Sequence, residues 1–312
     1  MQATAHTPPQ NLVPVRSAWP KRIARSLYWQ LLGLLPDRPY LALRYRLRFG
    51  QWPNYRKPAH FNEFTHAYML RARDPRMRTI ADKYLVRGFI AERVGERYLV
   101  PLLGVWDCPA AIPLERLPRP LVLKDTLGSG RNIVIRNACP EAIRRARIAL
   151  ADWQHAPYWH REREWAYAGG RSRVIAEPLL DDGVHEFPDD FKLYLIGGEL
   201  QFIQVDRDRF GNHTRNLYSP DWQLLPVRMT KPQRPADARP AALAEMIEVA
   251  RRLAEGFEFL RVDFYALGGR LLIGELTNYS GAGWERFDPP EFALRLGDRW
   301  RAAQAAGRSP GA

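Results

Sequence analysis

Two apolar segments joined by a Gly-Gly pair near the C-terminus constrain the fold of this chain more than any other feature. Residues 259–277 read FLRVDFYALGGRLLIGELT, and the β-branched and aromatic residues around the two glycines predict an antiparallel hairpin. Asp263 and Glu275 are about equally distant from the turn, so strand pairing would place their carboxylates side by side. Two acids on apolar strands repel each other, and they need a shared divalent cation or an ion pair with Arg261 or Arg270.

A second segment combines a lysine with a glycine-rich turn. Residues 121–135 read LVLKDTLGSGRNIVI, which predicts a strand, a turn and a second strand. Lys124 ends the first strand, and the backbone N–H groups of Gly128, Ser129 and Gly130 can converge on an anion. An ordinary hairpin turn has the same composition, so the segment indicates a phosphate site only together with other features.

The order of the remaining elements predicts a mixed α+β fold. It lacks the repeated βαβ units of a doubly wound sheet or an α/β barrel. Apolar periodicity predicts helices over residues 80–94, 140–153 and 240–256, and strands within residues 173–180 and 191–206.

Positive charge is concentrated in the N-terminal quarter. Residues 1–80 hold 14 Lys and Arg against 3 Asp and Glu, whereas residues 81–312 hold 33 against 31. A basic region of this kind attracts acidic polysaccharide precursors, anionic lipid or nucleic acid. We expect residues 1–20, which are Pro-rich, to be poorly ordered, and residues 21–35 to form a helix that Pro36 ends. That helix either packs on the core or lies on an anionic membrane surface.

Several protein classes are not expected. The chain has no recognition-helix, zinc-finger or RNA-binding pattern, so we do not expect sequence-specific nucleic-acid binding. Cys108 and Cys139 cannot form a disulfide framework, and residues 1–20 contain no apolar signal-peptide core. We therefore expect a cytoplasmic protein, with peripheral contact to the inner face of the membrane as an alternative. The oligomeric state stays open.

Two further segments complete a recognisable order of features. Asp82 and Lys83 begin a predicted helix, and residues 173–180, RVIAEPLL, run from a strand into a proline-interrupted segment at Glu177. Together with the lysine loop and the hairpin, they resemble the ATP-grasp superfamily, and more closely its TupA-like branch, named for teichuronopeptide biosynthesis. The resemblance covers about residues 55–300 and rests on PAHFNEF, ADKYLVRGFI, YLVPLLGVWD, VLKDTLGSG, REWAY, VIAEPLL, FIQVDRDRFGNHTRN, LRVDFYALGG and LLIGELTNYSGAG.

The resemblance implies an ATP-grasp fold, in which two α+β lobes grip ATP beside a basic helical N-terminal region. It also implies ATP and Mg²⁺ as cofactors, with catalytic roles for Arg261 and Lys124, because the arginine would neutralise charge on the transferring phosphoryl group. The implied ATP contacts are Lys83 and Lys124 at the phosphates, Gly128, Ser129 and Gly130 in the closing loop, Glu177, Pro178 and Leu180 at the adenine, and Asp190 at the ribose.

Asp263 and Glu275 match the metal ligands of the superfamily. Many ATP-grasp ligases carry an asparagine two residues after the second ligand, where this chain has Thr277 followed by Asn278. The threonine hydroxyl could ligate Mg²⁺ weakly, or Asn278 could serve through a bulge, so one metal ion and two both remain open.

The implied activity is ATP-dependent ligation of a carboxylate to an amine through an acyl phosphate. The substrates would be an acidic small molecule or polymer precursor and an amine, in the biosynthesis of a cell-surface polysaccharide or teichuronopeptide-like polymer. One alternative is an ATP-grasp kinase of a sugar or polyol. Another is a glycosyltransferase-like or non-catalytic protein of polysaccharide assembly.

Residues 206–216, DRDRFGNHTRN, contain candidate substrate ligands. Arginine binds carboxylate and phosphate through a bidentate guanidinium, so we assign Arg209 and Arg215 to the acidic substrate or the γ-phosphate, with His213 and Asn278 beside them. The alternative is a solvated charged loop. Replacing Arg215 with Ala is expected to impair turnover with little loss of folding.

These features also suggest a division of the chain. Arg163, Glu164 and Trp165 either line the same cleft as the candidate substrate ligands or have a packing role. The expected parts are a basic, mainly helical region (1–79), a small lobe with the glycine-rich loop (80–175), a C-terminal lobe with the metal site (176–303) and a frayed tail (304–312).

Overall fold

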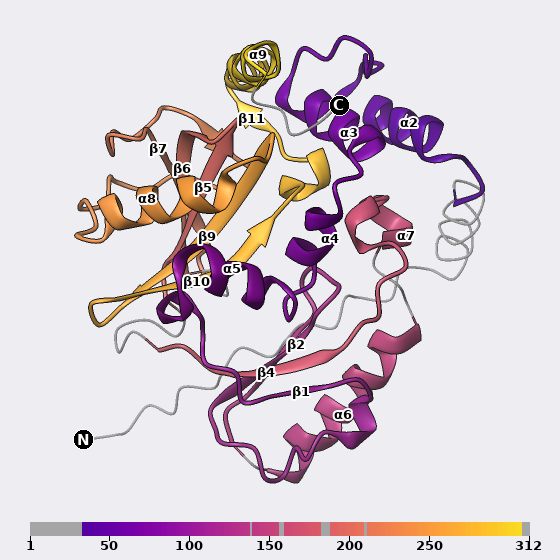
Figure 1. Ribbon diagram of the computed structural model, residues 1–312, viewed down its shortest axis with the longest axis vertical. Helices are drawn as coiled ribbons and strands as arrows, with labels where there is room; N and C mark the ends of the chain where they lie inside the picture. Colours follow the sequence, from indigo (N-terminus) through magenta and orange to yellow (C-terminus); the bar gives the residue numbers. More distant parts are fainter. Residues whose placement is uncertain (1–32, 138, 156–158, 182–187, 209–210, 308–312) are drawn as a thin grey trace, which may run out of the picture.

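Two antiparallel sheets organise the computed structural model, which describes residues 33–137, 139–155, 159–181, 188–208 and 211–307 (Figure 1). One sheet has four strands in the order β1-β4-β2-β3, and the other has five in the order β10-β9-β5-β6-β7. Every neighbouring pair of strands in the two sheets is antiparallel, and helices are not interleaved with parallel strands. The predicted α+β class is therefore confirmed.

The four-stranded sheet contains the glycine-rich segment. Both strands predicted there, β2 and β3, are confirmed, and β2 alternates buried and half-buried residues because one face packs on a helix. Leu123 of β2 and Leu150 of α6 are buried in this small apolar core. The elements are β1 (Gly104–Trp106), β2 (Leu121–Asp125), β3 (Asn132–Ile135), β4 (Val174–Pro178) and α6 (Pro140–His155).

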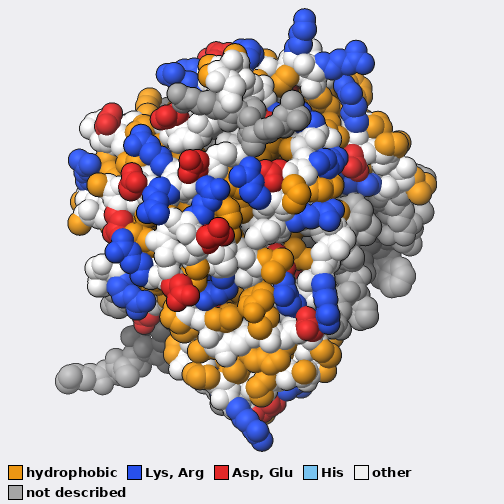
Figure 2. Space-filling view, in the orientation of Figure 1, with side chains coloured by type: hydrophobic (Ala, Val, Ile, Leu, Met, Phe, Trp, Pro, Cys, Tyr) orange, Lys and Arg blue, Asp and Glu red, His pale blue; other side chains and the backbone are white. Residues whose placement is uncertain are grey.

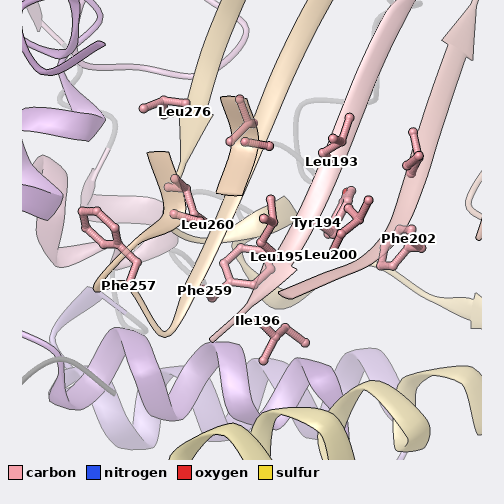
Figure 3. Packing of buried hydrophobic residues seen from close by; sticks show 14 of the residues in the cluster. Leu193, Tyr194, Leu195, Ile196, Leu200, Phe202, Phe257, Phe259, Leu260 and Leu276 are labelled. Carbon is pink, nitrogen blue, oxygen red and sulfur yellow. The ribbon is translucent and has the colours of Figure 1, made fainter. Parts of the chain in front are cut away.

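The five-stranded sheet carries the larger core. Its central strand β5 is buried along its whole length, because α8 and α9 contact it and strands flank it on both sides. Side chains of adjacent strands pack closely there; the rings of Tyr194 and Phe202 stack with centroids 4.1 Å apart (Figure 3). The elements are β5 (Asp190–Ile196), β6 (Glu199–Arg207), β7 (Thr214–Tyr218), β9 (Phe259–Leu267), β10 (Arg270–Thr277), α8 (Leu243–Ala254) and α9 (Glu291–Ala305).

The predicted helix over residues 80–94 is wrong at its N-terminal end. The Asp82 carboxylate accepts hydrogen bonds from the backbone N–H groups of Tyr84 and Leu85, at 2.8 and 3.1 Å, and so holds a turn there. A short helix ends before this turn and the next begins at Val86. The remaining helices are α2 (Asp37–Phe49), α3 (Phe61–Arg71), α4 (Pro75–Ala81), α5 (Val86–Val94) and α7 (Trp159–Glu162).

Short elements complete the chain. The strands β8 and β11 pair with each other in a separate two-stranded sheet. The bounds of these elements are β8 (Arg228–Met229), β11 (Phe287–Asp288), η1 (Glu96–Tyr98), η2 (Pro109–Ala111), η3 (Trp165–Tyr167) and η4 (Ser280–Gly283).

The N-terminal helices lie beside the two-sheet body rather than apart from it. Figure 1 places α2 and α3 next to α7 and α9. Tyr40 of α2 donates a hydrogen bond to the carbonyl of Arg161 at 2.7 Å, and Asn62 of α3 donates to the carbonyl of Gly283 at 2.9 Å. The expectations for residues 1–20, and for all but the end of the helix over residues 21–35, fall outside the described residues.

Three observations concern the surface charge, the length of the helices and the predicted division of the chain. On the face drawn in Figure 2, Lys and Arg side chains lie among Asp and Glu side chains over α8 and α5. None of the helices in the described part of the chain combines the length and apolar character that crossing a membrane requires. The four-part division of the chain stays a prediction. The predicted boundary between residues 175 and 176 would cut β4, which pairs with β1 and β2, so that boundary would have to follow Pro178.

Candidate functional site

A cavity of about 530 Å³ lies between the two sheets. Strands of both sheets, the glycine-rich loop and the segment around η4 contribute to its walls. Most of the residues that the sequence assigned to a site line it, namely Lys83, Lys124, Gly128, Ser129, Gly130, Asp190, His213, Arg215, Arg261, Asp263, Glu275, Thr277 and Asn278. Glu177, Pro178 and Leu180 instead line a smaller cavity of about 120 Å³, which shares Lys124, Asn132 and Tyr265 with the larger one.

The hairpin places its two carboxylates opposite each other, but only because one strand is irregular. From the turn to Ile273, β10 pairs with β9 in a regular register that would bring Gly274 opposite Asp263. A β-bulge at Gly274 shifts the register by one residue and brings Glu275 opposite Asp263 instead. A Cβ at Gly274 would lie 2.5 Å from the ring of Tyr265, so glycine suits this close approach.

Arg261 relieves the repulsion between these acids in the structure. Its guanidinium donates to Asp263 at 2.6 and 2.8 Å and to Glu275 at 3.3 Å, so the ion-pair alternative raised from the sequence is observed. Burial alone would raise the pKa of Asp263, but the attraction of Arg261 and Lys192 outweighs it and lowers that pKa. The same attraction to Asp263, opposed by burial, holds the pKa of Arg261 well above its ordinary value.

Lys192 is a site residue that sequence reasoning missed. It is buried in the middle of β5, directly opposite Asp263, and its ammonium donates to that carboxylate at 2.7 Å and also to Asp190. A lysine inside the apolar run FKLYLI is the signal that could have revealed it, because a buried lysine requires an acidic partner.

The donor set fits Mg²⁺ when phosphate oxygens supply the other ligands. Within the described residues, no group of three or more His, Cys, Asp or Glu side chains is placed to hold a metal. Mg²⁺ in proteins usually takes one or two carboxylates together with substrate phosphates and water, and Asp263 and Glu275 meet that need. Thr277 pairs with Arg261 on the neighbouring strand, and its buried hydroxyl has no hydrogen-bond partner in the part of the chain that the structure describes. It therefore offers a third oxygen two residues after Glu275.

Lys83, in the turn between α4 and α5, reaches the glycine-rich loop. Lys83 donates from its ammonium to the carbonyl of Gly128, and burial lowers its pKa. The loop is organised by Asp125, which accepts from the backbone N–H of Leu127 at 3.0 Å and from Arg131 at 2.7 Å. The loop and Lys83 are therefore held together at one end of the cavity.

Lys124 links the two cavities. Its ammonium lies 2.6 Å from Glu177, the predicted adenine-side glutamate, so in this structure that carboxylate is ion-paired. Asp190, assigned to the ribose, lines the larger cavity, whereas the adjacent Asp189 pairs with Arg207 at 2.9 Å. The ribose assignment of Asp190 stays a prediction.

Of the candidate substrate ligands, Arg215 lies on a strand and His213 directly precedes that strand. Arg215 is a residue of β7, opposite Asp206 of β6, because the strand pairing continues to Arg207 and Thr214. The Arg215 guanidinium donates to Asp206 at 2.6 and 3.2 Å, and His213 lies 3.1 Å from the same carboxylate. Burial opposes ionisation of Asp206, yet its bonds to Arg215 lower its pKa to about 2.

Asn278 and Arg209 are the remaining candidate substrate ligands. Asn278 lines the cavity, but its amide donates to the carbonyl of Met77 at 2.8 Å, which turns that group toward α4. The sequence left open that Asn278 could serve as a metal ligand through a bulge. The bulge of β10 lies before Glu275, so it does not bring Asn278 into the place of Thr277. Arg209 lies outside the described residues.

The chain matches a known protein family. The family model described as TupA-like ATPgrasp covers residues 64–301. The chain belongs to the TupA-like ATP-grasp family. This membership confirms the resemblance inferred from the sequence segments and identifies the fold as the α+β ATP-grasp fold. A search of curated protein sequences finds no significant match.

Solved structures with a similar arrangement are distant in sequence. The L-amino acid ligase from Bacillus licheniformis is 14% identical with a TM-score of 0.42, over 84% of this chain and 56% of that one. The D-alanine–D-alanine ligase from Bacillus anthracis, complexed with ATP, is 13% identical with a TM-score of 0.41, over 64% and 55%. The corresponding ligase from Helicobacter pylori is 14% identical with a TM-score of 0.41, over 74% and 60%. This chain thus spans little more than half the length of these ligases.

Proposed function

We propose that this TupA-like protein is an Mg-ATP-dependent ligase that activates a carboxylate as an acyl phosphate and joins it to an amine. The observation that carries the proposal is the gathering of Lys83, Lys124 and Arg261 around one cavity, with Asp263 and Glu275 on adjacent strands. A nucleoside triphosphate carries about four negative charges. In a site shielded from water, these charges must be balanced by a similar number of positive charges.

Each wall has its own task in this proposal. Lys83 and Lys124 hold the phosphates, and the backbone of the loop from Gly128 to Gly130 closes over them. The smaller cavity takes the adenine, with Glu177, Pro178 and Leu180 at its edge, and Asp190 meets the ribose.

The acids of the hairpin complete the nucleotide site. Asp263, Glu275 and Thr277 would hold Mg²⁺, which when bound neutralises phosphate charge and polarises the γ-phosphoryl group. Arg261 lies between the two carboxylates and neutralises charge that develops on the phosphoryl group during transfer. The chain's contribution is position and charge rather than covalent catalysis.

The acid substrate occupies the end of the cavity near β7. Arg215 and His213 line it there, and the sequence assigns Arg209 and Asn278 to the same substrate. We propose a uronic acid of a polysaccharide or teichuronopeptide-like polymer precursor as the substrate, because the branch resemblance and the basic N-terminal quarter both suit an acidic polymer. Contact of that quarter with an anionic membrane belongs to the same proposal.

Release of ADP and phosphate tests the function. A panel of uronic acids and amino acids is offered with Mg-ATP, and the expected result is release of both products only when an acid and an amine are present together. Asp263→Asn serves as control and is expected to lose about 100-fold or more in turnover. ADP release with phosphate retained on the product would indicate a kinase instead. No consumption of ATP with any pair would overturn the proposal and favour a glycosyltransferase-like or assembly role.

A further inference from the structure

One buried carboxylate in the larger cavity has no compensating partner. Glu164 is 4% exposed and lines the cavity, yet among the described residues neither a hydrogen-bond donor nor a cation is bonded to its side chain. Every other described carboxylate of the lining has one: Glu162 has Arg44, Asp190 and Asp263 have Lys192, Asp206 has Arg215, Glu275 has Arg261, and Glu285 has Ser280. An uncompensated buried acid is costly, so its position calls for a cationic ligand.

The backbone before Glu164 is held in a strained conformation that the N-terminal helix stabilises. Arg163 has φ of 58°, the left-handed region that side chains other than glycine rarely adopt. Its guanidinium donates to Asp37 at 3.1 Å and to the carbonyl of Gly33 at 2.7 Å, and it lies 4.6 Å from the ring centre of Tyr40. These anchors precede the residues that the family model matches. They fix the turn after which Glu164 enters the cavity.

The charges that act on Glu164 locate it beside the phosphate end of the site. Burial raises the pKa of Glu164 well above its ordinary value, and the negative charges of Glu162 and Glu275 raise it further. Arg261 and Lys83 act in the opposite direction. Three of these groups are the ones proposed to hold the phosphates and the metal ion, so the carboxyl lies within electrostatic range of the reacting phosphoryl group.

We propose that Glu164 is a catalytic base that receives the ammonium group of the second substrate and removes its proton. This inference rests on the proposed ligase function and names the residue that serves its second step. The cations of the cavity are committed to phosphate and acid, whereas Glu164 is the wall position suited to a positive group. Burial raises the pKa of the Glu164 carboxyl, so it accepts a proton from an ammonium more readily than an ordinary carboxyl does.

The ammonium R′NH₃⁺ gives one proton to Glu164, and the freed amine nitrogen attacks the carbonyl carbon of the acyl phosphate, forming the C–N bond. The C–O bond to phosphate then breaks, and the phosphate leaves with the electron pair. The phosphate takes the second nitrogen proton, so the products are an amide and hydrogen phosphate. Glu164 releases its proton to solvent before the next turnover.

Hydroxylamine separates this step from formation of the acyl phosphate. It is uncharged at neutral pH, so it captures an acyl phosphate as a hydroxamate without needing a base. The acid and amine pair that releases most phosphate in the panel is used with wild-type protein and Glu164→Gln. We expect the variant to keep hydroxamate formation within about twofold and to lose amide formation by about 100-fold. Glu255→Gln, at a side chain 83% exposed and away from the cavity, should change neither.

The outcomes are distinguishable. Hydroxamate in both proteins with equal amide formation would overturn the role of Glu164 and leave the ligase proposal intact. Equal loss of hydroxamate and amide in Glu164→Gln would also overturn it, because the residue would then act before the amine enters. If the wild-type protein forms no hydroxamate with any acid of the panel, the ligase function fails and this inference fails with it.

Discussion

The two sheets contribute to one cavity in opposite ways. The four-stranded sheet offers Lys124 and a glycine-rich loop, carried on a small apolar core and tied down by Asp125. The five-stranded sheet offers Arg261, Asp263 and Lys192 from the middle of strands in the larger core, where they bond to one another. The four-stranded sheet therefore presents backbone groups and the end of a lysine side chain to the ligand. The five-stranded sheet presents charged side chains whose mutual ion pairs also stabilise the fold.

This difference predicts unequal consequences of mutation. Removing one member of a buried ionic cluster leaves an uncompensated charge, which costs far more than the loss of an exposed ion pair. Changing the loop alters only local backbone preference. Substitutions in the ionic cluster of the five-stranded sheet should therefore lower the free energy of unfolding strongly. Substitutions in the loop of the four-stranded sheet should lower it only weakly.

The largest effect is expected for Arg261→Met. Among the described residues, the substitution leaves Lys192 as the only cation bonded to the buried Asp263, with Glu275 beside it. It should lower the free energy of unfolding by about 3 kcal/mol. Urea denaturation followed by tryptophan fluorescence measures it. Arg270→Met, at the exposed start of the same hairpin, is the matched control and should change stability by less than about 0.5 kcal/mol. Equal losses in the two variants would contradict the contrast between the sheets.

Arg215→Ala is expected to follow. Its partner Asp206 has a pKa lowered from 3.8 to about 2, which corresponds to about 2 kcal/mol of stability. Because the folded-state pKa is depressed, this stabilisation is present above about pH 4 and is lost as the pH falls toward 2. The destabilisation by Arg215→Ala should shrink over the same interval. The ion pair thus revises the expectation from sequence that this variant would fold almost normally, and pH-dependent urea denaturation decides between the two.

Glu164→Gln should move stability in the opposite direction. Burial raises the pKa of Glu164, so the folded state holds a proton at pH values where the unfolded chain has lost it. Stability contributed by this group is complete below about pH 4 and falls as the pH rises through the folded-state pKa. The variant should therefore be more stable than wild type at neutral pH, and this difference should disappear near pH 4. Thermal unfolding at both pH values checks this, and a loss at neutral pH would indicate that the carboxylate has a structural partner.

The smallest effect is expected for Gly130→Ala in the loop. Gly130 has φ of 73° and open space where a Cβ would lie, so only the left-handed backbone opposes the substitution, at a cost of about 1 kcal/mol. Its main consequence should be a raised KM for ATP, measured by ADP release. A loss of stability as large as that of Arg261→Met would show that the loop belongs to the folding core after all.

Several parts of this description followed from residue patterns. Alternation and turn residues predicted β2, β3, β9 and β10, and apolar periodicity predicted α6 and α8, because these elements depend on neighbours in sequence. The segments of the resemblance led to the family, which the family model confirms. The helix start at Val86 was missed because the Asp82 side chain bonds to nearby backbone N–H groups, a local competition that periodicity does not reveal.

The sequence by itself determined the hairpin, the α+β class and the kinds of charge that a site would use. Only the tertiary structure decided which charges meet. The bulge at Gly274 set Glu275 opposite Asp263, and the pairing of β5 with β9 brought Lys192 to the same acid. Contacts with α2 fixed the turn before Glu164. A shift of one residue in a strand exchanges its faces, and residues far apart in the chain come together only through packing, so neither result is encoded in a local pattern.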